Sequence, residues 1–305
     1  MMFIKKYILK NPLNKYIKCY WVLKVDDGKM IREISPSSNI SVCYCIGGKS
    51  SFSLLSSDFW NGQPQSVDFL LERLGDAPAT ASDFIIGPHR NIMMEYSDDG
   101  MFTFGIEFKT GLRKVFFGND ITMLSNNVVP LTDNATILSS IKNIVSCCPE
   151  NRLIDEVDDY LTKTWLPYMQ NKDCNSELPL IIDSISANPF EAEVSILSER
   201  MYMSERSFQR LFRQHTGLTL RDFIGIKKID KVLDMMMTHK ECSLIEVLEM
   251  SGYYDYTHIN RDFKIIGGLP ASQVFGNIRE RILNSPDGYC VNYPEDDVCA
   301  VNLLL

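Results

Sequence analysis

Arginine side chains recur at helical spacing in one segment of the C-terminal third of the chain. A helix through this segment carries four long polar side chains on one face: Arg206, Gln209, Arg210 and Arg213. Its opposite face carries Phe208, Leu211 and Phe212, which suit a hydrophobic core. Most such polar faces only meet solvent, but arginine also binds phosphate and pairs with guanine, and glutamine pairs with adenine. The spacing therefore favours a helix that contacts double-stranded nucleic acid.

The same pattern returns 51 residues later, which makes a solvated face the weaker interpretation. Pairs at this offset in the second half of each copy are Ser204 with Asp255, Arg210 with Arg261, and Phe212 with Phe263. Upstream, the same offset pairs Val194, Ile196 and Leu197 with Ile245, Val247 and Leu248. Each copy reads as a short apolar helix, a tight turn and a second helix that begins after a capping residue. This is the organisation of a helix-turn-helix unit.

The elements around these helices set where the polar faces lie. We expect the first helices at residues 191–199 and 244–250, with Gly252 supplying a positive φ in the second turn. Between the units, residues 219–239 carry apolar side chains at helical spacing and no proline. A helix of roughly 20 residues is about 30 Å long, close to the roughly 34 Å of one DNA turn. One chain is therefore expected to place two helices in successive major grooves.

Charge is unevenly distributed along the chain, whose net charge is −8. Residues 206–231 hold seven basic and two acidic side chains, so a basic surface survives within an acidic protein. Residues 241–262 instead hold five acidic side chains against Arg261. We therefore expect the first unit to supply most of the affinity for DNA.

The run from Ser243 to Pro270 resembles the signature of AraC/XylS regulators. It carries Gly252-Tyr253-x-Asp255, Thr257-x-Ile259-x-Arg261-x-Phe263-Lys264 and Gly268-x-Pro270. The resemblance implies a double helix-turn-helix domain with DNA contacts at Arg206, Gln209 and Arg210 in the first unit and at Thr257, Asn260 and Arg261 in the second. Arg213 and Lys264 complete our set of candidate DNA contacts. The run departs from the family pattern at three places, where Leu248 replaces alanine, Ile259 replaces phenylalanine and Pro270-Ala271 replaces Ser/Thr-Pro.

The N-terminal half has the alternation and turn residues of a β domain. Expected strands cover 16–25, 40–46, 51–55, 84–86 and 101–108. This half resembles a sensor-type domain that precedes such DNA-binding units, through Ile34-x-Pro36, Ile86-Gly87-Pro88, Phe104-x-Ile106-x-Phe108-x-x-Gly111 and Val129-Pro130-Leu131. The resemblance implies a cupin-like β-barrel or sandwich that holds a small ligand or mediates association. Its ligand-binding residues are unknown.

The expected fold class is therefore α+β, with a predominantly β N-terminal domain and an all-α C-terminal domain. We expect a β-rich sensor or association domain at 1–130 and linking helices with a linker at 131–175, its boundary marked by a polar stretch at 170–176. A DNA-binding domain then covers 176–284. Residues 285–305 form a tail to which no role is assigned.

Several functional classes lack support in the sequence. The nine cysteines include no C-x-x-C pair and the four histidines are scattered, so we expect neither a metal site nor a cofactor. Cys43 and Cys45 share one strand face, where two core thiols are a commoner arrangement than a redox switch. His89 is interpreted as a turn histidine rather than a pocket residue, and the aromatic residues Trp21, Trp60, Phe102 and Phe104 as core. No apolar run reaches the roughly 20 residues needed to span a bilayer, so a cytoplasmic protein is expected.

The favoured hypothesis is a sequence-specific DNA-binding transcription regulator, controlled by a small ligand or by association through the N-terminal domain. Its partners would be double-stranded DNA, a small-molecule effector, a second copy of the chain and, for an activator, RNA polymerase. One alternative is a degenerate member of the family that acts mainly through protein contacts. An enzyme with its site in the β domain is the weakest hypothesis, because no catalytic triad order or phosphate-binding loop is present.

Overall fold

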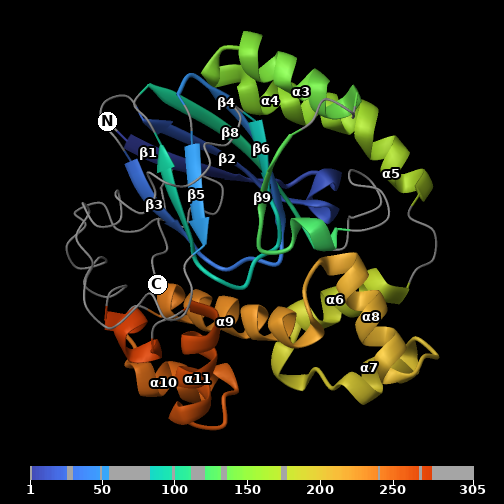
Figure 1. The fold of residues 1–305 in the computed structure, drawn as a ribbon, viewed down its shortest axis with the longest axis vertical. Helices are drawn as coiled ribbons and strands as arrows, with labels where there is room; N and C mark the ends of the chain where they lie inside the picture. Colours follow the sequence, from blue (N-terminus) through green and yellow to red (C-terminus); the bar gives the residue numbers. More distant parts are fainter. Residues whose placement is uncertain are drawn as a thin grey trace.

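The computed structural model describes residues 2–25, 30–48, 50–54, 83–97, 100–110, 121–131, 136–172, 177–239, 241–267 and 270–276. A β sandwich occupies the N-terminal part and helices form the rest, so the expected α+β fold class is confirmed (Figure 1). The tail at 285–305, the linker residues 173–176, Trp60, Gly111 and Gly268 lie outside the described residues.

Two antiparallel sheets make up the sandwich. The larger sheet has the order β1-β2-β8-β4-β6-β9 and the smaller has the order β3-β7-β5. Strands of the larger sheet are β1 (Met2–Ile8), β2 (Ile17–Val25), β8 (Met101–Phe108), β4 (Ile40–Ile46), β6 (Asp83–Ile86) and β9 (Val128–Pro130). Strands of the smaller sheet are β3 (Met30–Ile34), β7 (Met93–Ser97) and β5 (Ser50–Leu54). Five strands confirm the sequence prediction within one residue at each end, whereas β1, β3, β7 and β9 were not predicted.

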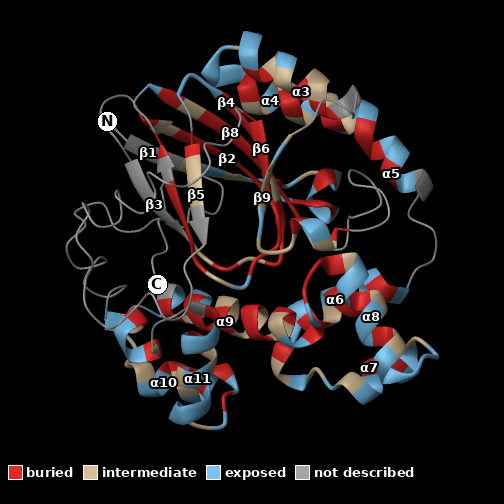
Figure 2. Ribbon diagram, viewed as in Figure 1, coloured by how far each residue is buried: buried red, intermediate tan, exposed pale blue. Residues whose placement is uncertain are grey.

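Strands β2, β4 and β8 are buried along almost their whole length, so both faces of the larger sheet are covered (Figure 2). One face meets the smaller sheet, where Phe52 of β5 packs edge-on against Phe84 of β6 with ring centroids 4.8 Å apart. Trp21 lies in this layer directly over Gly105, and a Cβ built on Gly105 would fall 2.0 Å from the indole ring. Glycine is therefore required at position 105 because any side chain would collide with Trp21.

Helices cover the other face of the larger sheet (Figure 1). They are α3 (Thr136–Cys147), α4 (Glu150–Tyr160), the π-helical turn η4 (Leu161–Trp165) and α5 (Leu166–Lys172). The predicted common face of Phe104, Ile106 and Phe108 points into this layer, where Trp165 packs on Phe108 with ring centroids 5.7 Å apart. The helices after residue 130 thus complete the core of the sandwich, because they bury a sheet face that would otherwise meet water.

The C-terminal helices share a second core built around one long helix. They are α6 (Glu177–Ala187), α7 (Val194–Arg200), α8 (Glu205–Thr216), α9 (Leu220–Thr238), α10 (Leu244–Ser251) and α11 (Tyr256–Gly267), with a short 3₁₀ helix η5 (Pro189–Glu191) before α7. Helices α7 and α8 form the first unit, α10 and α11 the second, and α9 joins them as predicted. The first helix of the first unit begins at Val194, three residues later than predicted, because η5 occupies the preceding residues.

The repeat offset differs between the two halves of each unit. For the second helices the predicted offset of 51 is right, since Ser204 caps α8 by accepting the amide of Ser207 and Asp255 caps α11 by accepting that of His258. For the first helices it is wrong by one residue. Leu197 and Val247 are the equivalent buried positions, and Tyr202 and Gly252 are the equivalent positive-φ positions. The two members of each pair lie 50 residues apart in the sequence. The second turn therefore contains one additional residue.

The turn of the first unit carries conformational strain that a substitution can test. Tyr202 has a φ of 53° and is 98% exposed, so its side chain packs on almost nothing that offsets the left-handed backbone. Tyr202→Gly is expected to raise the free energy of unfolding by about 0.5–1 kcal/mol in chemical denaturation. Tyr202→Ala removes the same ring but keeps the strain, so it should give no gain. Equal stability of the two variants would show that the backbone is not strained there.

Candidate nucleic-acid interface

Helix α8 presents the arginine face because both of its ends and its inner face are fixed. Ser204 caps its N-terminus and Gly217, with a φ of 76°, ends it in the left-handed conformation. Phe208 and Phe212 are fully buried, and the Phe212 ring packs edge-on against Phe223 of α9 at 5.3 Å between centroids. The predicted inward face is thereby confirmed. The four polar side chains on the other side of α8 are exposed.

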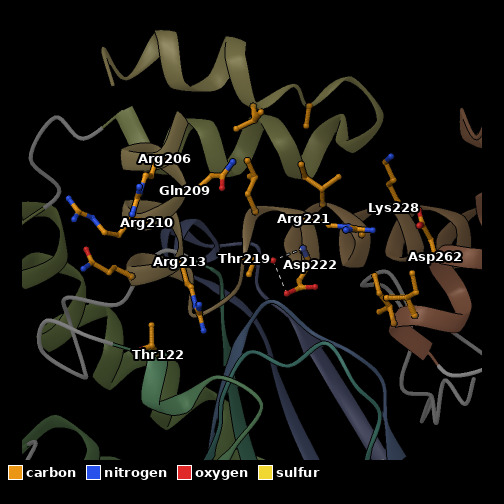
Figure 3. A pocket seen from close by; sticks show the side chains of 18 of the residues that line it. Thr122, Arg206, Gln209, Arg210, Arg213, Thr219, Arg221, Asp222, Lys228 and Asp262 are labelled. Carbon is orange, nitrogen blue, oxygen red and sulfur yellow. Dashed lines mark hydrogen bonds between the residues drawn. The ribbon is translucent and has the colours of Figure 1, made fainter. Parts of the chain in front are cut away.

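A groove of about 840 Å³ runs beside this face, between α8, α9 and α11 (Figure 3). Six basic side chains line it: Arg206, Arg210, Arg213, Arg221, Lys228 and Arg261. Two acidic side chains, Asp222 and Asp262, also line it, so the described residues of the lining carry a net charge of +4. Such a concentration of positive charge in an acidic chain suits a polyanion.

Both acidic side chains of the groove are held by neighbouring groups. Asp222 accepts a hydrogen bond from the Thr219 hydroxyl at 2.7 Å and lies 3.5 Å from a guanidinium nitrogen of Arg90. Asp262 accepts the Tyr253 hydroxyl at 3.2 Å, and burial together with this carboxylate raises the pKa of Tyr253 well above its usual value. A hydrogen bond from a neutral hydroxyl leaves the carboxylate charged, and Asp262 also lies 4.0 Å from a guanidinium nitrogen of Arg261. The groove stays positive because its basic side chains outnumber these two acids.

Five of the eight candidate DNA contacts come together in the groove. They are Arg206, Gln209, Arg210 and Arg213 of α8 and Arg261 of α11. Thr257 and Lys264 are exposed on α11 but do not line the groove. Asn260 is half-buried, and its side-chain oxygen accepts the Ala271 amide at 2.8 Å, so part of this side chain holds the backbone.

Two basic residues of the groove, Arg221 and Lys228, were absent from the predicted set. They lie seven residues apart on α9, which is about two helical turns and therefore one helix face. The sequence held a signal for them, because both fall within the basic stretch 206–231. Charge alone does not place them in the groove, which follows from the packing of α9 against both units.

The remaining candidate sites of the N-terminal part are structural. His89 is buried, with one ring nitrogen 2.8 Å from the Gly87 carbonyl oxygen and the other 2.9 Å from that of Ser35, which confirms the turn interpretation. Burial lowers the pKa of this imidazole. Cys43 and Cys45 are buried in the layer between the sheets, as core thiols. Trp21 and Phe104 are likewise buried in the core, and Phe102 packs partly buried against it.

Within the described ranges, no group of three or more histidine, cysteine or acidic side chains is placed to hold a metal ion. In the same part of the chain, none of the helices combines the length and the apolar character that crossing a bilayer requires.

Known sequence profiles match both halves of the chain. The sequence profile of a helix-turn-helix domain matches residues 197–277, and that of a domain of unknown function (DUF6597) matches residues 6–130. The helix-turn-helix domain with its basic groove defines a DNA-binding protein of the transcription regulator class. A helix-turn-helix domain behind a separate N-terminal domain is consistent with the resemblance of the sequence to AraC/XylS regulators.

Solved structures that match the chain include those of ToxT from Vibrio cholerae. A structure at 1.65 Å resolution is 9% identical in sequence with a TM-score of 0.43, and the match covers 81% of this chain and 97% of that one. A structure of wild-type ToxT bound to an unsaturated fatty acid is 9% identical with a TM-score of 0.42, covering 90% and 94% of the two chains. No curated protein sequence matches the chain.

The groove predicts that a residue outside the recognition helices contributes to DNA binding. Arg221→Ala is expected to weaken binding about five- to tenfold at moderate salt, because it removes one phosphate contact. It should also make the slope of log K against log salt less steep by about 0.9. Titration of a labelled duplex at several salt concentrations measures both quantities.

Arg152→Ala serves as the matched control, because Arg152 lies on α4 over the sandwich and its loss changes the net charge equally. An equal loss of affinity in both variants would show that the total charge of the protein, rather than the groove, governs binding.

Proposed function

We propose that the chain is a sequence-specific DNA-binding transcription regulator that reads one site with two helices, α8 and α11. The groove carries this proposal, since it brings side chains of both helices to one concave basic surface (Figure 3). Arg206, Gln209 and Arg210 would read base edges in one major groove, and Arg213 would bind phosphate. On α11, Thr257, Asn260 and Arg261 would read the next groove, with Lys264 on the flanking backbone.

The length of α9 supports reading by a single chain. Its 19 residues span about 28 Å, slightly less than the roughly 34 Å of one DNA turn. The two units therefore face successive major grooves on the same side of a duplex. The DNA site would then consist of two sequence elements about one turn of the duplex apart.

We assign most of the affinity to the first unit. Four of the six basic side chains of the groove belong to α8 or to the start of α9, and α11 contributes only Arg261. Several acidic side chains of the second unit serve structure: Glu246 completes a capping box with Ser243, and Asp255 caps α11. The second unit would then contribute selectivity more than attraction.

Control by the N-terminal domain is the second part of the proposal. That domain touches the first unit where α8 ends and α9 begins: a Cβ on Gly217 would lie 2.8 Å from the Pro88 ring, and Arg90 pairs with Asp222. Thr122, in the 3₁₀ helix η3 (Thr122–Leu124), lines the groove itself. A small ligand or a second copy that repacks this domain would shift how the first unit is presented, and hence the population able to bind DNA.

Selection of DNA fragments tests the first part. Purified full-length protein is expected to enrich a motif of two elements at moderate salt. Arg206→Ala/Arg210→Ala should lose this motif, because both side chains project from the first recognition helix into the groove. A double variant remote from the groove, Arg152→Ala/Lys163→Ala, removes the same charge from exposed positions and should retain it. If neither the wild type nor the control enriches a motif, the chain does not read DNA alone.

A double-mutant cycle on Arg90 and Asp222 tests the coupling of the domains. Arg90→Ala, Asp222→Asn and the double variant are compared by the Kd for the selected duplex. If the contact between the domains influences DNA binding, the two effects are expected to depart from additivity by about twofold. Asp222→Asn retains an oxygen that can accept from Thr219, so the start of α9 is preserved. Strictly additive effects would argue against coupling through this contact.

A further inference from the structure

Phe190 joins the two helix-turn-helix units, although it belongs to the first by sequence. It lies in η5, ahead of α7, and its ring packs edge-on against Tyr253 at 5.0 Å between centroids. Tyr253 is only 8% exposed and stands in the turn before α11. The backbone of that turn is equally close, because a Cβ on Gly252 would lie 3.2 Å from the Phe190 ring.

Helix α9 holds the same ring from another side. The ammonium nitrogen of Lys228 lies 5.2 Å from the centre of the Phe190 ring, and that of Lys231 lies 5.8 Å from it. Lys228 is also 5.8 Å from the centre of the Tyr253 ring. Cations at these distances from aromatic faces are attracted to them. The cluster of Phe190, Tyr253, Lys228 and Lys231 thus connects η5, which leads into the first unit, with the second unit and with α9.

We propose that Phe190 is a positioning residue that fixes the separation and rotation of α11 relative to α8, and so sets the spacing between the two DNA elements. The inference rests on the proposed reading of two grooves. Both units pack on α9, and these contacts alone permit small bending and twisting of one unit relative to the other. The contact of η5 with the turn of the second unit limits this motion, because η5 lies just ahead of α7.

The geometry of DNA determines how firmly the two units must be held relative to each other. One added base pair moves the second element by about 3.4 Å and rotates it by about 35° around the duplex axis. Units that turn freely would follow such a change, whereas units held by the cluster would not. Phe190 is only partly buried, and each unit keeps its own buried residues without it, Phe208 and Phe212 in the first and Ile259 and Phe263 in the second. Its loss is therefore expected to loosen the pair of units and leave each unit folded.

The test measures the affinity of the full-length chain for the selected duplex and for duplexes with one base pair added or removed between the elements. The wild type is expected to lose at least tenfold in affinity on either change. Phe190→Ala should bind the selected duplex more weakly, and its three affinities should fall within about threefold of one another. Its affinity for a duplex with only the element read by α8 should equal that of the wild type. Phe190→Tyr keeps the ring and should restore the spacing preference.

A second variant covers the case in which Phe190→Ala fails to fold. Lys231→Met removes one cation from the ring without removing a charge from the groove, and it should relax the spacing preference in the same direction by a smaller factor. Folded variants that keep the wild-type spacing profile overturn the role of Phe190. A wild type that is itself indifferent to spacing overturns the reading of two grooves, and the inference falls with it.

Discussion

The DNA-binding half depends on the packing of both units against one helix, α9. Its buried residues, which include Phe223, Ile226 and Val232, form the middle of a core to which every other C-terminal helix contributes. At Gly225 a Cβ would lie 2.4 Å from the terminal methyl of Ile266, so α11 lies close to α9 at this position. Recognition helices stay on one side of the molecule because they share this support. The basic groove is the surface that results from it.

The same packing explains how an acidic chain presents a cationic surface. Apolar side chains of α8 and α9 face the core, which leaves arginines and Lys228 on the side between the units. Among the described residues of the groove, the acidic side chains Asp222 and Asp262 are outnumbered by six basic ones. Net charge therefore says little about binding here, because the field that a phosphate meets depends on local arrangement.

The N-terminal domain is connected to this arrangement by apolar packing as well as by charge. Ile92 and Met94, at the start of β7, belong to the same apolar cluster as the C-terminal helices. The sandwich therefore contacts the core of the DNA-binding half in addition to the end of α8 (Figure 1). Such a connection offers a physical route by which a change inside the sandwich reaches the groove.

Local sequence predicted the elements that have strong periodicity. The alternating strand of Phe104 and Ile106, the arginine face of α8 and the course of α9 follow from residue spacing alone. Strands β3 and β7 were missed because they belong to a small sheet in which β7 pairs with both β3 and β5, and pairing partners distant in sequence determine structure there. The one-residue difference in length between the two turns was missed because matching side chains indicated a single offset of 51 for both helices of each unit. The positive-φ position, which marks the end of the first helix, is Tyr202 in one unit and Gly252 in the other, so residue type did not reveal it.

Spacing along the chain does not predict which polar side chains meet in the groove. Arg221 and Lys228 reach the groove because α9 lies between the two units, and Phe190 reaches the second unit because η5 turns back toward it. The basic stretch 206–231 marks Arg221 and Lys228 as charged, but their place in the groove and the contact of Phe190 depend on tertiary packing. The candidate contacts of α8 were predictable, and the surface that they share with α9 and α11 required the fold.

Hydroxyl-radical footprinting of a selected duplex with one chain bound tests the central claim most directly. The account predicts two protected stretches on the same face of the DNA, about one helical turn apart, because α9 places the two recognition helices at that separation. One protected stretch, or two on opposite faces, would contradict the account of a single groove shared by both units.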